Sequence, residues 1–237
     1  MNLLEVYHLN CFYGQSQVLW DVGLNIRAGQ KVAVVGSNGA GKTTLLRALS
    51  GLHKISAGGI KWKGRNIENS QPHEIVELGI SQIPEGGGIF PYMTVLENLR
   101  VGAFSKKNWQ RRSENTKRVF EMFPRLRERE EQAAGTLSGG ERQMLGIGKG
   151  LMSSPELLIL DEPSAGLSPK LVLNLFDTIE SIAREGITVL LVEQNVHHAM
   201  AMTDRAIIIE NGRLVKEGDS KTLLEDDYVK KSYLGMS

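Results

Sequence analysis

The sequence predicts an α/β protein with a mixed sheet in its core, an N-terminal antiparallel β subdomain and an inserted α-helical subdomain. Two features of the pattern support this prediction. Apolar runs too short for helices occur at 32–35, 157–160 and 187–192, and such runs are typical of buried strands. Between about 94 and 153 the pattern changes to helices alone. A chain of 237 residues is long enough to bury the core of such a fold.

Two strands are predicted at the N-terminal end. Residues 3–9 partly alternate between apolar and polar, and residues 18–26 form a second segment that Gly23 interrupts. Phe12 and Tyr13 lie between these two segments. An aromatic side chain at this point can stack on a purine base, or it can simply pack in the core. The spacing alone favours neither interpretation.

A phosphate-binding turn is predicted at residues 36–44, between the apolar run 32–35 and a segment with helical spacing. A strand, a turn of the form G-x-x-x-x-G-K-T and a helix together make a P-loop. The glycines let backbone N–H groups surround an anion at the helix N-terminus. Lys42 can reach the β- and γ-phosphates, and the Thr43 hydroxyl can ligate Mg²⁺. We therefore expect a P-loop NTPase core, and the flanking strand and helix argue against a chance match.

After this turn the pattern predicts four further elements and a glycine loop. Residues 58–62 and 65–67 suggest a hairpin edge, and 72–78 a short helix with proline in its first turn. Residues 80–84 form a strand, which is followed by Glu85 and three successive glycines. Three glycines after a strand predict a mobile loop. It is either a plain surface connection or a hinge beside the phosphates.

The middle of the chain is predicted to hold three helices, at 95–103, at 109–123 and from Ser138 onward, with a charged, solvated stretch at 125–131. We expect a single domain, divided into an α/β core with its β subdomain at 1–85 and 155–237, and a helical subdomain at 86–154.

The α/β pattern then returns. The run 157–160 ends in Asp161 and Glu162, at the strand end where open α/β sheets bind ligands. In a P-loop enzyme an aspartate there holds Mg²⁺, and the next glutamate can polarise an attacking water. A helix at 169–184 and a strand at 187–192 follow. Two strands joined by Asn-Gly at 211–212, which suits a type I′ turn, and a short helix with an amphipathic tail complete the pattern.

Composition limits the classes of function. The chain has 28 basic and 27 acidic residues, so nothing indicates a nucleic-acid-binding protein. Its single cysteine, Cys11, fits a reducing compartment. No apolar run reaches the roughly twenty residues that cross a bilayer, and the N-terminus does not look like a signal peptide. We therefore expect a soluble cytoplasmic protein.

Residues 137–143, with the sequence LSGGERQ, indicate the family. Ser138 can cap a helix whose first amides and dipole offer a second anion site. A second such site is useful in a head-to-tail dimer, where it closes over the partner's P-loop. The segment resembles the signature of ATP-binding-cassette ATPases. The P-loop, the signature and the acidic strand end occur in that family's order over essentially the whole chain.

The resemblance implies ATP as substrate, Mg²⁺ as cofactor and a role for several residues. Tyr13 is expected to stack on adenine, and residues 164–168 match the loop that touches the partner's active site. The expected nucleotide-binding residues are Tyr13, Val18, Gly36, Ser37, Asn38, Gly39, Ala40, Gly41, Lys42, Thr43 and Thr44. The expected signature residues, facing the partner's ATP, are Leu137, Ser138, Gly139, Gly140 and Glu141. The expected catalytic residues are Lys42, Glu162 and Gln194, and the expected metal-linked residues are Thr43, Asp161 and Glu85.

Three positions depart from the commonest pattern of the family. Glu85 stands where the mobile loop usually carries Gln, Gln194 where a His is usual, and Ser168 where an Asp is usual. With these departures the chain resembles the LivF-type cassettes of branched-chain amino-acid importers, and the ending at 233–235 agrees. Cassettes of urea or amide importers and of lipopolysaccharide exporters are similar, and a cassette protein outside transport is a further alternative.

As a LivF-type cassette, the chain is expected to pair with a second cassette. The pair is a homodimer in isolation and a heterodimer in the complex. Further expected partners are membrane permease subunits and, indirectly, a substrate-binding protein, but no nucleic acid. Its expected location is the inner face of the cell membrane, and Glu85 is expected to act as a coupling residue toward the permease.

Overall fold

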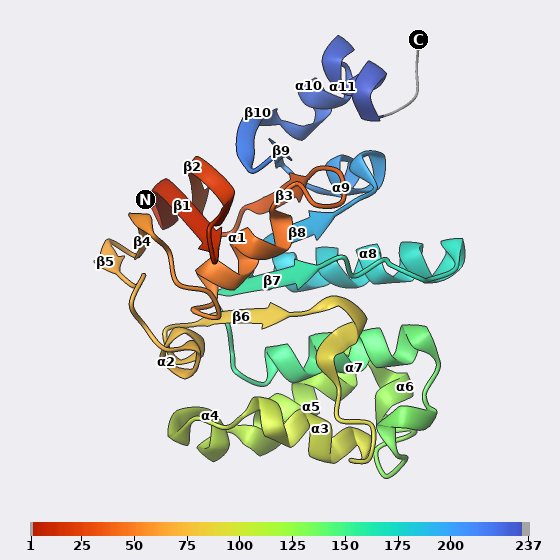
Figure 1. Cartoon of the computed structure of the whole chain (residues 1–237). Coiled ribbons are helices and arrows are strands. Elements are labelled where there is room, and N and C mark those ends of the chain that lie inside the picture. Colours follow the sequence, from red (N-terminus) through yellow and green to blue (C-terminus); the bar gives the residue numbers. More distant parts are fainter. Residues whose placement is uncertain (1, 234–237) are drawn as a thin grey trace.

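The computed structural model describes residues 2–233 and contains two sheets (Figure 1). A four-stranded sheet has the order β2-β1-β4-β5, and a six-stranded sheet has the order β10-β9-β3-β8-β7-β6. The strands are β1 (Asn2–Tyr13), β2 (Ser16–Arg27), β3 (Lys31–Val35), β4 (Ala57–Trp62), β5 (Arg65–Asn66), β6 (Ile80–Ile83), β7 (Leu157–Asp161), β8 (Thr188–Glu193), β9 (Arg205–Glu210) and β10 (Arg213–Asp219).

Helices cover the larger sheet, and a block of them lies beside its β6 edge (Figure 1). Two further short segments are the glycine turn η1 (Glu85–Gly88) and the 3₁₀ turn η2 (Ala134–Thr136). The α-helices are α1 (Lys42–Leu49), α2 (Pro72–Glu77), α3 (Val95–Gly102), α4 (Lys106–Gln110), α5 (Arg112–Met122), α6 (Pro124–Arg127), α7 (Gly139–Leu151), α8 (Pro169–Arg184), α9 (Val196–Met202), α10 (Ser220–Leu224) and α11 (Asp227–Tyr233).

The larger sheet is mixed, as predicted. Strands β6, β7, β8, β3 and β9 run parallel, and β10 pairs antiparallel with β9. Because parallel strands end at one edge of a sheet, the segments that follow β3, β6, β7 and β8 all begin at that edge. The register aligns Val35 with Glu193 and Asp161 with Val192. The turn after β3 and the acidic end of β7 therefore lie near each other.

Alternation along the buried strands produces a hydrophobic cluster on each face of the larger sheet. In β7, Leu158 and Leu160 belong to the cluster that includes the helical block, whereas Leu157 and Ile159 belong to the cluster under the four-stranded sheet. Strands β3, β8 and β9 divide in the same way. Side chains two residues apart in a strand share a face, so both faces are apolar and the sheet is covered on each.

The structure changes three element predictions in detail. Strand β2 extends through Gly23, although its register with β1 shifts between Val22 and Leu24. The helix predicted at 109–123 is instead α4 and α5, with a bend at Arg111 (φ −96°, ψ 7°). The side chain of Asn108 donates to the Ser153 carbonyl and anchors α4 at the end of α7. Helical periodicity cannot reveal such a long-range contact.

The third change concerns the predicted glycine loop, which forms the compact turn η1 with Gly87 buried and with φ of 73° at Gly86 and 78° at Gly87. Its mobility stays a prediction. By contrast, the Asn-Gly hairpin is as predicted, with φ of 47° at Asn211 and 76° at Gly212.

Residues 234 and 235 of the predicted family-like ending lie outside the described residues. The subdomain boundaries at 85 and 155 stay a prediction. Within residues 2–233, no helix has the length and apolar character needed to cross a membrane.

We predict that Gly102→Ala destabilises the fold, because α3 lies directly against the backbone of α7. A methyl group on Gly102 would meet the Lys149 carbonyl oxygen at 2.0 Å, and backbone cannot yield as a side chain can. Such overpacking costs about 1–3 kcal/mol. Urea unfolding measures the loss. The matched control is Gly23→Ala, where the nearest atom would be 3.5 Å away. Equal unfolding midpoints for the two variants would contradict this packing.

Candidate functional site

The turn between β3 and α1 is shaped to bind an anion. A methyl group on Gly36 would meet the Ile209 carbonyl oxygen at 2.2 Å, so only glycine allows this close approach. Helix α1 begins at Lys42 after Gly41, whose φ is 106°, and no side chain caps it. Its first N–H groups and the positive end of its dipole are therefore available to a phosphate. The P-loop geometry predicted at 36–44 is present.

Lys42 lies buried within this turn, with 5% of its surface exposed. Its ammonium donates to the carbonyl oxygens of Gly36 at 2.9 Å and Ser37 at 3.2 Å, and it lies 3.4 Å from a carboxylate oxygen of Glu162. The turn's own backbone therefore satisfies the cation. Thr43 is exposed at the start of the helix, while Thr44 is buried.

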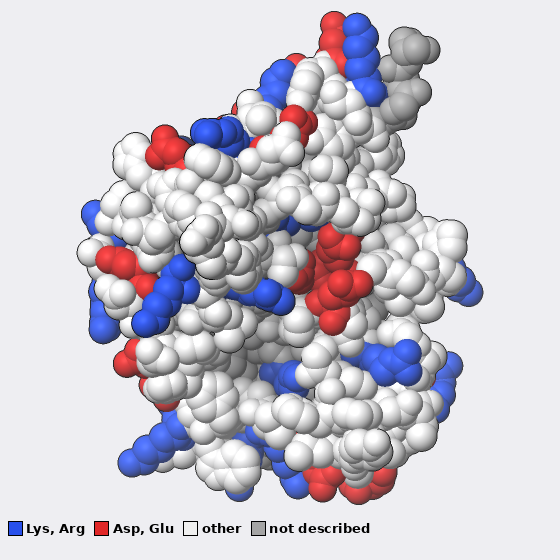
Figure 2. Space-filling model, in the orientation of Figure 1, with Lys and Arg blue, Asp and Glu red and all other residues white. Residues whose placement is uncertain are grey.

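Acidic side chains gather at the edge of the larger sheet, where Figure 2 shows a red group in the middle of the visible face. Asp161 ends β7 and is 7% exposed. Burial raises its pKa to about 6, and the charges of Glu162 and Glu85 act in the same direction, while Lys42 opposes them. The three predicted acids therefore lie close enough to repel each other. This edge carries more negative charge than its cations offset.

Glu162 is held in a left-handed backbone conformation, with φ of 43°. A non-glycine residue adopts this conformation only at a cost, which its surroundings must offset. Its N–H donates to the Val192 carbonyl at 2.8 Å, and its own carbonyl accepts from the N–H of Ala165 at 3.1 Å. Glu162 and Gln194 line the same hollow, of about 360 Å³. Glu162 thus faces both predicted catalytic partners, Lys42 and Gln194.

Glu193 also lines this hollow, and no role for it follows from the sequence pattern. It ends β8, and burial raises the pKa of its carboxyl group. Its Oε1 accepts a hydrogen bond of 3.0 Å from the Ser164 N–H. The signal that points to it is an acid at the end of a buried strand, the same signal that identifies Asp161.

Tyr13 lies at the surface, since 43% of it is exposed, so its ring is not part of the core. The ring centroid is 4.4 Å from that of His53, and Arg47 of α1 donates to the hydroxyl at 3.3 Å. Val18 of β2 adjoins the phosphate-binding turn. A methyl group on Gly41 would meet its carbonyl oxygen at 3.4 Å. Val18 therefore lies beside the start of α1, whereas Tyr13 contacts Arg47 in the last turn of that helix.

The predicted signature lies at the start of α7, in the helical block (Figure 1). Ser138 caps the helix as predicted, because its hydroxyl accepts from the Glu141 N–H. The Glu141 carboxylate in turn accepts from the Ser138 N–H at 2.9 Å. Glu141 therefore completes a capping box. Gly139 has open space around it, Gly140 packs on Leu171, and Leu137 is buried.

Turn η1 is packed against α7, so Glu85 and the signature helix are connected. A methyl group on Gly87 would meet the Arg142 carbonyl oxygen at 2.8 Å, and one on Gly146 would meet the Gly87 carbonyl oxygen at 2.4 Å. Lys149 donates to the Gly88 carbonyl. Glu85 itself is exposed.

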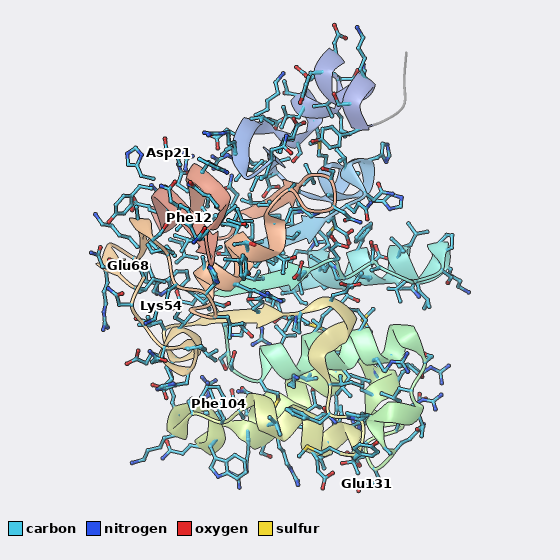
Figure 3. All side chains as sticks on the ribbon, in the orientation of Figure 1. Phe12, Asp21, Lys54, Glu68, Phe104 and Glu131 are labelled. Carbon is cyan, nitrogen blue, oxygen red and sulfur yellow. The ribbon has the colours of Figure 1, made fainter. Side chains whose placement is uncertain are left out.

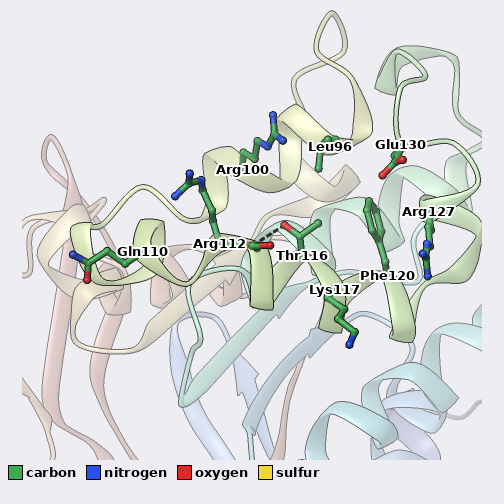
Figure 4. A pocket seen from close by; sticks show the side chains of 10 residues that line it. Leu96, Arg100, Gln110, Arg112, Thr116, Lys117, Phe120, Arg127 and Glu130 are labelled. Atoms are coloured by element: carbon green, nitrogen blue, oxygen red, sulfur yellow. Dashed lines mark hydrogen bonds between the residues drawn. The ribbon is translucent and has the colours of Figure 1, made fainter.

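A separate hollow of about 660 Å³ lies in the helical block and is lined by residues of α3, α5 and α6, among others (Figure 4). Its basic side chains are Arg100, Arg112, Lys117 and Arg127. None of the predicted site residues lines it. The predicted chemistry is therefore concentrated at the sheet edge and not in this hollow.

Comparison with known proteins agrees with this geometry. The family model described as "ABC transporter" matches residues 19–165. The chain is 43% identical to the high-affinity branched-chain amino acid transport ATP-binding protein BraG of Pseudomonas aeruginosa, over 98% of this chain and all of the relative. It is 37% identical to the probable branched-chain amino acid transport ATP-binding protein LivF of Archaeoglobus fulgidus, over 99% of each chain.

The fold matches a solved structure of an ATP-binding cassette of an ABC transporter in its ADP conformation. The TM-score is 0.85, with 28% identity over 99% of each chain. The segment that matches the family model, residues 19–165, includes the phosphate-binding turn, the signature and the acidic end of β7. The chain therefore belongs to the ABC transporter family, as one of its ATP-hydrolysing ATP-binding cassettes.

Proposed function

We propose that this chain energises the import of branched-chain amino acids, as one of two cassettes on the inner face of a membrane permease. The observation that carries the catalytic part is the convergence of Lys42, Glu162 and Gln194 at the sheet edge. The names of its relatives, BraG and LivF, support the transport part. A cassette supplies energy and does not bind the transported molecule. The proposal that branched-chain amino acids are transported therefore rests on the names of these relatives.

The residues of the turn and the sheet edge have distinct roles in hydrolysis. When ATP binds, the Lys42 ammonium exchanges the carbonyl oxygens of Gly36 and Ser37 for phosphate oxygens and stabilises the charge that develops there. Glu162 orients the attacking water and accepts its proton. Gln194 donates a hydrogen bond to the γ-phosphate and accepts one from the water, without titrating near neutrality. Tyr13 stacks on the adenine, and Val18 borders it.

The donor set at the sheet edge fits Mg²⁺. The pKa of Asp161 is raised by burial and by the charges of Glu162 and Glu85, and a divalent cation relieves that repulsion. The exposed Thr43 hydroxyl and the Asp161 carboxylate would hold the ion, with Glu85 linked to it. When bound, Mg²⁺ neutralises charge on the phosphates. Within residues 2–233, no group of three metal-binding side chains forms a protein cage, which suits a metal held mainly by phosphate and water.

We further propose that two cassettes join head to tail. The start of α7, with Ser138, Gly139 and Gly140, faces ATP on the partner's P-loop, and the 164–168 loop touches the partner's site. The open space around Gly139 supports this, because a ligand can approach the backbone there. The pair is a homodimer in isolation and a heterodimer in the transporter.

The permease is proposed to dock beside turn η1. A small apolar hollow of about 180 Å³ ends at Pro84 and is lined by Leu52 and residues of α2 and β6. Leu52, Phe90 and Met93 expose apolar surface around the same turn. A cytoplasmic helix of a permease has the matching chemistry. Glu85, between this surface and Asp161, would then report nucleotide state to the permease, and a periplasmic binding protein would act through the permease.

Replacement of Lys42 by alanine tests the catalytic centre. We expect Lys42→Ala to lower ATP turnover by about a hundredfold, since a transition-state contact worth about 3 kcal/mol is lost. Steady-state hydrolysis with Mg²⁺ measures the effect. Lys54→Ala, at an exposed lysine labelled in Figure 3, is the control and keeps full turnover. Wild-type turnover in Lys42→Ala would refute the catalytic role of Lys42.

Replacement of Glu162 by glutamine tests the dimer. We expect Glu162→Gln to form a dimer with ATP and a monomer with ADP, measured by light scattering, because the base is lost while both ATP-binding surfaces persist. The control is Glu162→Gln with Gly139→Asp. That position has room for a side chain in the monomer, but a carboxylate there would repel the partner's phosphates. A Glu162→Gln protein that stays monomeric with ATP, alone and with its sister cassette, would contradict the head-to-tail arrangement.

Replacement of Glu85 by alanine tests coupling. In a reconstituted transporter we expect Glu85→Ala to keep much of the basal hydrolysis and to lose uptake and its stimulation by loaded binding protein. Hydrolysis and uptake are measured side by side in vesicles. Glu121→Ala, at an exposed glutamate of α5, serves as the control. Uptake and stimulated hydrolysis at wild-type levels in Glu85→Ala would refute the coupling role.

A further inference from the structure

Glu193 connects two loops of the catalytic edge that are otherwise separate in the chain. It is the last residue of β8, directly before Gln194, and it is 3% exposed. Its Oε1 accepts from the N–H of Ser164, which opens the 164–168 loop after β7. We infer that Glu193 is a positioning residue that holds this loop and Gln194 in register with Glu162. The inference rests on the proposed catalytic roles of Glu162 and Gln194.

The hydrogen bonds of Glu193 match the needs of a fixed anchor. Burial raises the pKa of its carboxyl group, and the Glu162 charge adds to this rise. Ser164 and the backbone of Gln194 act in the opposite direction and lower this pKa. The hydrogen bond that the carboxylate accepts comes from the Ser164 N–H, at 3.0 Å. A buried acceptor that binds a loop amide holds that loop against the end of β8, where Gln194 follows directly in the chain.

The end of β8 also fixes the catalytic glutamate. The Val192 carbonyl, one residue before Glu193, accepts from the Glu162 N–H at 2.8 Å and supports its left-handed backbone. Glu193 then holds Ser164, two residues after Glu162. Two successive residues of β8 thus hold the chain on both sides of Pro163. Glu162, Ser164, Ala165, Glu193, Gln194 and Asn195 line one hollow, so a shift of the loop alters the shape of that hollow beside Glu162.

This role requires an oxygen at position 193 that accepts a hydrogen bond, and it does not require the negative charge of Glu193. Two substitutions distinguish the two properties. Glu193→Gln keeps an oxygen that accepts from the Ser164 N–H. Glu193→Met has similar length but no strong acceptor and leaves the Ser164 N–H without this partner. Misplacement of catalytic groups by about 1 Å can cost about a hundredfold in rate. We expect a fall in kcat of about ten- to a hundredfold for Glu193→Met, with KM for ATP nearly unchanged because the residue does not touch nucleotide.

The test measures kcat and KM for the full-length chain with its sister cassette, together with amide hydrogen exchange at Ser164. Glu193→Gln should keep most of the turnover, and the control Glu156→Met, at an exposed glutamate before β7, all of it. The Ser164 amide should be protected in the wild type and exchange faster in Glu193→Met. Wild-type kcat in Glu193→Met would overturn the inference, and so would equal losses in both Glu193 variants.

Two further measurements distinguish a failure of the Glu193 inference from a failure of the proposed function. If Glu193→Met does not fold, Ser164 exchange in the wild type decides, because an amide that exchanges as fast as exposed loop amides refutes the anchor. If wild-type protein does not hydrolyse ATP, or Glu162→Gln hydrolyses it normally, the proposed function fails. Protection of the Ser164 amide would still report on the hydrogen bond itself.

Discussion

The site depends on the close approach of backbone to backbone around the phosphate-binding turn. Gly36 lies against the Ile209 carbonyl, and a Cβ there would come within 2.2 Å of that oxygen. The hairpin turn after β9 completes the support, since the Gly212 N–H donates to the Ala40 carbonyl at 2.9 Å and the Trp20 N–H donates to the Gly212 carbonyl. The turn is therefore held by β2 and β9, and a bulkier residue at either glycine would displace it.

Charge balance at the sheet edge is the second constraint. Lys42 is placed between the turn's carbonyl oxygens and Glu162, while Asp161 has a raised pKa because burial and two acids outweigh the nearby cations. The repulsion among these acids is unfavourable in the protein alone. It favours a ligand that brings a cation to the acids and accepts hydrogen bonds from Lys42. Nucleotide binding and hydrolysis thus depend on charged side chains at the sheet edge whose charges are only partly balanced in the folded protein.

The helical block is connected to the core through turn η1. The glycines of this turn lie against the backbone of α7, and Lys149 binds the Gly88 carbonyl and lies 5.0 Å from the centre of the Phe90 ring. The turn also carries Glu85, whose charge acts on Asp161. The signature helix and Glu85 are therefore connected through close-packed backbone.

The sequence by itself determined the order and type of most elements, the P-loop, the acidic end of β7 and the capped start of α7. These are local features, because turn glycines, caps and strand periodicity act within a few residues. It did not determine that β2 passes Gly23, that the predicted helix at 109–123 bends at Arg111, or that the glycine loop is a packed turn. Tertiary pairing and packing decide those. Only the structure showed that Glu193 binds Ser164 and that Tyr13 lies exposed beside His53, because these contacts join residues 29 and 40 positions apart in the chain.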